Sequence, residues 1–164
     1  NQYNRNYSTF CPSNIYGPND HFGAETSHFI AALVHKVHSA SEGDTINLWG
    51  TGLPLRQQLY IEDLCEIIPI LLEKHNSDVP LIVSPNENLS IDEMAKTLLK
   101  SINKKVEIVY NKQLDGQFRK DGDNSELKKL IGDYNFTSFK EGVFRTYMWF
   151  VAQKLINSHG MIHF

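Results

Sequence analysis

The sequence predicts an α/β fold, on three observations. Short runs that are apolar, or in which apolar and polar residues alternate, are typical of strands. Along the chain they are interspersed with longer segments whose apolar residues recur every three or four positions, as in helices. This order favours parallel strands, because helices then cross over between neighbouring strands. The 164 residues suffice for one domain with a buried core, and proline and glycine are not enriched.

The first two predicted elements enclose a segment of polar and aromatic residues. Residues 8–12 are an apolar run that ends in proline, which predicts a buried strand. The apolar residues after Ser27 recur at helical spacing and predict a helix that ends at about residue 39 or 41. Residues 14–28 therefore lie where a strand gives way to a helix, the place where ligands bind in open α/β sheets. An ordinary Gly-Pro turn with a surface histidine accounts for the same residues, and composition alone does not decide between the two.

The middle of the chain predicts a strand, an extended link and a helix. Residues 45–49 alternate as a strand, which a Gly-Thr-Gly turn closes. Residues 55–60 are short and extended. Acidic side chains in its first turn predict a helix that begins at residue 61 and ends near residues 74–76. This helix is apolar on most sides, so we expect it to be largely buried.

Two capping boxes predict helix starts in the second half of the chain. In each, a serine is followed three residues later by a glutamate, at residues 90–93 and 138–141. The first box follows a short strand at residues 79–83. The second begins a long helix, whose apolar positions include Phe144, Met148, Val151 and Leu155.

Three shorter elements lie between the two boxes. Residues 106–110 alternate and predict a strand with every second side chain on one face. Residues 115–120 form a polar loop around an Asp-Gly turn, and residues 124–131 form a short helix. The tail after residue 158 shows no pattern.

Composition argues against several classes of partner and site. The net charge of −3 and the pI near 6.2 give no electrostatic footprint for nucleic acid. No apolar run reaches membrane-spanning length and no signal peptide is recognised, so we expect no membrane partner. Both cysteines fall in apolar segments, which favours packing thiols, a reducing compartment and a cytoplasmic location. We expect no metal site, because His28, His35 and His38 fall on different helix faces.

Several side chains that can bind or react lie near predicted strand ends. They are His28, Lys36, Trp49, Arg56 and Lys120. Taken singly, each is an ordinary surface charge or core aromatic. Together they supply what a nucleoside-diphosphate site needs: cations for the pyrophosphate, an indole face for a base or sugar, and an imidazole that moves a proton next to a ketone.

Three groups of motifs resemble one family of nucleotide-sugar enzymes. They are PSNIYGPND with SH (residues 12–20 and 27–28), LWGTGLPLRQ with IEDL (48–57 and 61–64), and DGQFRK with NSEL (115–120 and 124–127). The first group alone indicates the broad family of nucleotide-sugar epimerases and reductases. With the other two, the chain resembles the C-terminal half of the GDP-L-fucose synthases (GDP-4-keto-6-deoxy-D-mannose 3,5-epimerase-4-reductases), from residue 2 to about 153. These enzymes belong to the extended short-chain dehydrogenase/reductase family.

The resemblance implies the last strand–helix segments of a Rossmann-like sheet plus a smaller α/β substrate-binding domain. Residues 1–25 would end the dinucleotide-binding domain, with return segments at about 45–85. Residues 26–157 would be mainly the substrate-binding domain, and 158–164 a tail. In the family, an N-terminal Rossmann domain binds NADPH through a Gly-rich loop and carries a catalytic Tyr-x-x-x-Lys pair. The sequence contains neither and begins without methionine, so we expect a piece of a longer enzyme that is inactive by itself.

The resemblance also implies roles for matching positions. His28 matches the epimerisation acid, which lies close to the cofactor as well. The segment that lines the nicotinamide matches Pro12, Ser13, Asn14 and Ile15, and Asn14 lies near the reacting sugar. The substrate-binding positions match Asn14, Lys36, Trp49, Arg56, Asp115 and Lys120. No role is implied for Glu107, where some members carry an arginine that contacts the substrate.

The implied function of the complete enzyme is conversion of GDP-4-keto-6-deoxy-D-mannose to GDP-L-fucose, by 3,5-epimerisation and NADPH-dependent 4-keto reduction. Two alternatives stay open: another nucleotide-sugar epimerase or dehydratase of the same family, or a non-catalytic binding module that keeps the substrate domain. The expected partner is a GDP-sugar, and the complete protein is expected to be a homodimer. The isolated piece would expose a strand edge and an apolar face, which predicts self-association.

Overall fold

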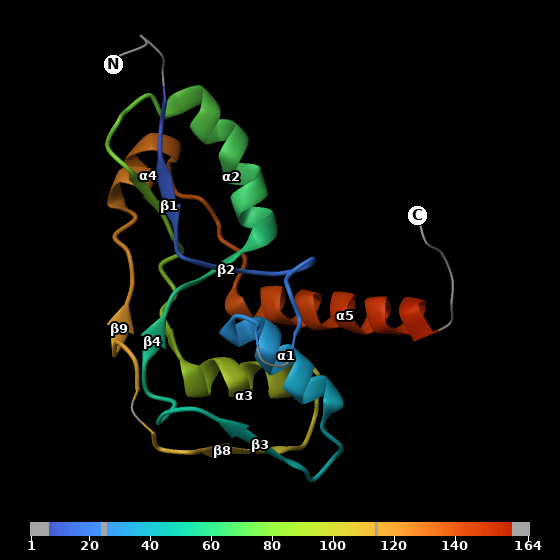
Figure 1. Cartoon of the computed structure of the whole chain (residues 1–164). Coiled ribbons are helices and arrows are strands. Elements are labelled where there is room, and N and C mark those ends of the chain that lie inside the picture. Colours follow the sequence, from blue (N-terminus) through green and yellow to red (C-terminus); the bar gives the residue numbers. More distant parts are fainter. Residues whose placement is uncertain (1–6, 24–25, 114, 159–164) are drawn as a thin grey trace.

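Figure 1 shows the computed structural model of the chain, which describes residues 7–23, 26–113 and 115–158. The helices are α1 (Phe29–Ser39), α2 (Ile61–Lys74), α3 (Ile91–Ser101), α4 (Ser125–Ile131) and α5 (Phe139–Ser158). The strands are β1 (Phe10–Pro12), β2 (Asn14–Tyr16), β3 (Thr45–Leu48), β4 (Leu55–Arg56), β5 (Gln58–Tyr60), β6 (Leu81–Val83), β7 (Leu89–Ser90), β8 (Glu107–Tyr110) and β9 (Arg119–Lys120). The predicted α/β fold is confirmed.

Parallel pairing dominates the sheets, as the alternation of elements predicts. β1 pairs with β6, β2 with β5 and β3 with β8, all in parallel. A three-stranded sheet places β4 between β7, which is antiparallel to it, and β9, which is parallel. Because each sheet is small, the helices that pack against them supply much of the buried surface.

Two hydrophobic cores hold the chain together. The larger is built by α1, α3, α5 and β3, and the smaller by α2, β6 and α4. In Figure 1 these two groups occupy opposite ends of the molecule, and β2, β4 and β5 run between them. The division of the chain into two domains near residue 25 stays a prediction.

The helix starts follow the local signals in the sequence. At α3 the capping box is complete: the Ser90 Oγ accepts from the Glu93 N–H at 3.1 Å, and the Glu93 carboxylate accepts from the Ser90 N–H at 2.8 Å. At α5 the Ser138 Oγ accepts from the Glu141 N–H at 3.3 Å. The Glu141 carboxylate pairs with Arg145 one turn further on, so this box forms in one direction.

The start of the chain departs from the sequence prediction. A strand, β2, occupies positions where a loop was expected, and β1 is mostly exposed rather than buried. Cys11 and Cys65 are free and exposed, so the prediction that they are packing thiols is wrong. Cys11 and its register partner Ile82 share an open face. The opposite face of this two-stranded sheet packs into the smaller core.

Two helices leave apolar side chains exposed. Leu72 on α2 is 79% exposed, so the expectation that this helix is largely buried is wrong. On α5, Phe144 and Met148 are exposed. The residues that α5 buries are Phe139, Gly142, Val143, Thr146 and Phe150. In Figure 1 the second half of α5 extends beyond the other helices. In the described part of the chain, no helix combines the length and the apolar character that crossing a bilayer requires.

Candidate functional site

A hollow of about 1360 Å³ opens where the loops after β2 and β3 meet the first turns of α1. Residues of β4 and β5 close its far wall. Ligand pockets for small molecules typically measure about 300–1,000 Å³, so this hollow has room for a nucleotide sugar. Its position agrees with the rule that ligands bind outside the carboxyl ends of parallel strands.

Seven of the ten predicted site residues line this hollow: Ser13, Asn14, Ile15, His28, Lys36, Trp49 and Arg56. The other three, Pro12, Asp115 and Lys120, are not among the residues of its wall. Lys120 is nevertheless the register partner of Arg56 in the β4–β9 pair, so it lies beside the wall. The structure therefore brings together predicted residues that lie up to 43 positions apart in the sequence, from Ser13 to Arg56.

Asn14 is held by a part-buried network of hydrogen bonds that centres on Gln57. Its Nδ2 donates to the Gln57 carbonyl at 3.1 Å. Gln57 is 5% exposed; its Nε2 donates to the Pro85 carbonyl at 2.8 Å, and its Oε1 accepts from the Gly122 N–H at 2.7 Å. Sequence patterns did not single out Gln57, because these partners lie 28 and 65 residues away. The network fixes the position of Asn14 at the wall.

His28 directly precedes α1 and lines the hollow. Its backbone is extended, with ψ 161°, and its carbonyl accepts from the Ala32 N–H at 2.9 Å. The side chain makes no capping hydrogen bond and is exposed. The imidazole is therefore accessible to a ligand, at a point that the start of the helix fixes.

Two cationic side chains enter the hollow from different elements. Lys36 on α1 donates from Nζ to the Asn47 carbonyl at 2.9 Å, which ties α1 to the end of β3. Arg56 on β4 donates from Nη1 to the Leu55 carbonyl at 2.7 Å. Neither takes part in any ion pair within the described ranges. Their charges are thus available to an anionic ligand, and Arg56 has the fork that binds phosphate oxygens in pairs.

Two buried hydroxyls have no hydrogen-bond partner among the described residues: Ser13 Oγ and Tyr16 Oη. Ser13 lines the hollow, so its hydroxyl suits a polar group of a bound ligand. Burial, followed by the charge of Glu87, raises the pKa of Tyr16 far above its ordinary value. Burial and Glu62 raise the pKa of Tyr60 to about 12. Both phenols therefore stay neutral at neutral pH and do not serve as bases there.

Trp49 follows β3 and is 82% exposed, and the loop after it is tied down. The Thr51 N–H and Oγ–H donate to the two Asp115 carboxylate oxygens at 2.8 and 2.6 Å. These bonds lower the pKa of Asp115. The Gly50 N–H donates to the Asn111 Oδ1 at 3.0 Å. The Gly-Thr-Gly turn was recognised in the sequence, but its partners were missed because they lie 61 and 64 residues away.

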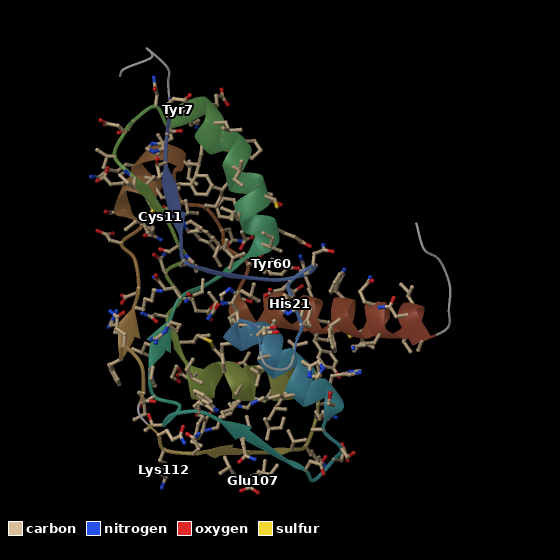
Figure 2. The ribbon with its side chains drawn as sticks, viewed as in Figure 1. Tyr7, Cys11, His21, Tyr60, Glu107 and Lys112 are labelled. Atoms are coloured by element: carbon tan, nitrogen blue, oxygen red, sulfur yellow. The ribbon has the colours of Figure 1, made fainter. Side chains whose placement is uncertain are left out.

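Other charged side chains lie away from this wall. Figure 2 shows Glu107 and Lys112 pointing outward at the edge of the molecule near β3 and β8. Neither residue lines the hollow. Within residues 7–23, 26–113 and 115–158, no cluster of three metal-ligating side chains occurs.

Three comparisons relate the chain to known proteins. Residues 1–84 match the model of the NAD dependent epimerase/dehydratase family. The chain is 32% identical over 165 residues to the GDP-L-fucose synthase of Escherichia coli (strain K12), which covers 93% of this chain and 51% of that protein. It is 30% identical over 161 residues to a probable GDP-L-fucose synthase of Drosophila melanogaster, covering 92% and 50%.

A solved structure agrees with these matches. The crystal structure of a GDP-L-fucose synthetase from Naegleria fowleri bound to NADP superposes with a TM-score of 0.85 at 28% identity. The superposition covers 90% of this chain and 47% of that one. The resemblance to GDP-L-fucose synthases is confirmed, and the chain spans about half the length of the curated relatives that it matches.

Proposed function

The chain belongs to the NAD-dependent epimerase/dehydratase family, and we propose that it is the GDP-sugar-binding part of a GDP-L-fucose synthase. The observation that carries this proposal is the convergence of His28, Lys36, Trp49 and Arg56 on one hollow. The complete enzyme converts GDP-4-keto-6-deoxy-D-mannose to GDP-L-fucose in this proposal, by epimerisation at C3 and C5 and reduction of the 4-ketone.

The side chains of the hollow divide the nucleotide sugar between them. Arg56 and Lys36 bind the diphosphate, and Lys120 adds a third cation beside Arg56. Trp49 offers its exposed indole face to the base or the sugar. Asn14, held through Gln57, orients the sugar.

His28 acts as the proton donor of the epimerisation. The 4-ketone makes the hydrogens on C3 and C5 acidic, so a base removes one of them and leaves an enolate on the substrate. The His28 imidazolium then gives its proton to the opposite face of that carbon, which forms the inverted C–H bond and leaves a neutral imidazole. Imidazole suits this step because it exchanges a proton near neutral pH.

The residues of this chain fit one end of NADPH. In this proposal Ser13, Asn14, Ile15 and His28 would hold the nicotinamide end, with Pro12 beside the wall, and the unpartnered Ser13 hydroxyl suits a carboxamide. NADPH, when bound, supplies the hydride that reduces the ketone. The sequence contains no Gly-rich phosphate loop, so we expect the 164 residues by themselves to bind NADPH weakly and to be inactive.

Calorimetric titration of GDP-L-fucose, and separately of GDP, into the chain tests the proposal. We expect binding of both, weakened about 10- to 100-fold by Arg56→Ala, because a charge-assisted pair with phosphate contributes about 1.5–3 kcal/mol. Lys129→Ala is the matched control: it also removes one positive charge, but from an exposed ion pair with Glu126 on α4. Its affinity should equal that of the unchanged chain.

Two outcomes would contradict the proposal. No heat with either ligand from a folded chain would show that the hollow is not a preformed nucleotide-sugar site. Tighter binding of UDP-glucose than of GDP-L-fucose would favour another nucleotide-sugar epimerase of the same family.

A further inference from the structure

Gln58 begins strand β5 and lines the hollow, although it lies outside the sequence motifs. The other two residues of the strand, Leu59 and Tyr60, are buried in the two hydrophobic cores. Glutamine is mostly found at protein surfaces, because burying its carboxamide without partners costs free energy. The strand is therefore apolar where it crosses the cores and polar where it borders the hollow.

The neighbouring strand β2 shows the same change at the same place. Tyr16 and Tyr60 are register partners, and their ring centroids lie 5.6 Å apart. Asn14 and Gln58 are the partners two residues earlier. Because alternate residues of a strand point to the same face, the two carboxamides share the face of the two tyrosines. Paired strands lie about 4.7–4.9 Å apart, so Asn14 and Gln58 are close enough to bind one sugar ring.

The two adjacent glutamines differ in their hydrogen bonds. The buried Gln57 carboxamide donates to the Pro85 carbonyl at 2.8 Å and accepts from the Gly122 N–H at 2.7 Å. The half-buried Gln58 carboxamide bonds to none of the residues in the described part of the chain. Its two N–H groups and its carbonyl oxygen are thus available to a ligand.

Gln58 also lies between the residues that bind the diphosphate and the sugar in the proposed function. Arg56 and Gln58 both line the hollow, whereas Gln57 between them does not. Two positions of an extended chain span about 6–7 Å. On its other side, β2 brings Asn14 next to Gln58. A ligand whose diphosphate binds Arg56 and whose sugar is oriented by Asn14 therefore passes Gln58 with its sugar.

The geometry points to Gln58 as a further specificity-determining residue, whose carboxamide hydrogen-bonds a hydroxyl group of the sugar beside Asn14. A carboxamide both donates and accepts, and so does a hydroxyl, so each can satisfy the other. A sugar without that hydroxyl would cover the carboxamide and leave it unpaired, which costs affinity. This assignment deepens the proposed function and rests on it for the identity of the ligand.

Calorimetric titration of Gln58→Leu with GDP-L-fucose, and separately with GDP, tests the assignment, because GDP lacks the sugar. We expect GDP-L-fucose to bind about three- to tenfold more weakly than to the unchanged chain, as for the loss of one neutral hydrogen bond, and GDP to bind equally well. Arg56→Ala should weaken both ligands. Gln153→Leu makes the same substitution on α5, away from the wall of the hollow, and should change neither affinity.

Thermal unfolding separates this role from a structural one. Gln58→Leu should keep the melting temperature of the unchanged chain, whereas Gln57→Leu should lower it, because the Gly122 N–H loses its acceptor. An equal loss for both ligands, or no loss for either, would overturn the assignment while the proposed function stands. A melting temperature of Gln58→Leu as low as that of Gln57→Leu would also overturn it. If the unchanged chain binds neither ligand, the proposed function fails and the assignment with it.

Discussion

We predict that Asp63→Ala destabilises the chain by about 3 kcal/mol, in the lower part of the range that its contacts allow. Asp63 lies in the first turn of α2 and is 5% exposed. Its carboxylate accepts from the Thr137 N–H at 2.9 Å and from the Thr137 Oγ1–H at 2.7 Å. Alanine leaves both donors without an acceptor, at about 1–3 kcal/mol each. It also removes a negative charge from a helix N-terminus, which contributes about 0.3–1 kcal/mol.

Urea unfolding at pH 7, followed by circular dichroism, measures this loss. For a chain of 164 residues it corresponds to a fall in melting temperature of about 6–12 °C. Asp133→Ala is the control, because that carboxylate is 95% exposed and lies 4.0 Å from Lys128; it should change the free energy of unfolding by less than about 0.5 kcal/mol. A loss below about 1 kcal/mol in Asp63→Ala would refute the reasoning, since the two donors would then have found other partners.

Three further predictions concern α1, α2 and the proton donor. Lys104→Met removes the ammonium that donates to the Val37 and His38 carbonyls at the end of α1, and should cost about 1–2 kcal/mol in urea unfolding. Burial, and then the charge of Lys104, lowers the pKa of His38 from 6.5, so the unfolded chain binds this proton more readily than the folded chain. The free energy of unfolding should therefore be constant above about pH 6.5 with respect to this group and fall as the pH decreases below it. The fall should be less steep in Lys104→Met. Leu72→Glu should reduce self-association measured by sedimentation velocity, and an unchanged chain that stays monomeric at every concentration would contradict this. His28→Ala, in a protein that also carries the cofactor-binding half, should suppress deuterium uptake at C3 and C5 more than ketone reduction; equal losses would remove its assigned role.

Signals that act within a few residues were predicted correctly from the sequence. The Ser90–Glu93 box begins α3 because both partners lie within one turn, so no distant contact is needed. Strand β8 also agrees, since the alternation of residues 106–110 by itself separates a half-buried from an exposed face. Local features of this kind do not depend on which distant element packs against them.

The errors arise where more than one arrangement satisfies the sequence pattern. On α5, apolar side chains occupy several faces of the helix, and only the packing of α1 and α3 selects Val143 and Phe150 for the core while Met148 stays exposed. The same holds for α2, where Leu72 lies on the face that no described element covers. Hydrophobic periodicity predicts that an apolar face exists, but not which neighbour covers it.

The arrangement of the site likewise could not be derived from the sequence, and α1 shows how the fold produces it. Motif resemblance implied that His28, Lys36, Trp49 and Arg56 belong to one site, but gave no geometry for how their separate strand and helix ends come together. In the structure α1 carries two of these residues, and its tie from Lys36 to the Asn47 carbonyl brings the end of β3, and with it Trp49, to the same hollow. The eight residues from His28 to Lys36 span about 12 Å along a helix. The helix therefore sets the separation between His28 and Lys36. In the proposed function, a nucleotide sugar whose diphosphate binds Lys36 extends its sugar end toward the imidazole.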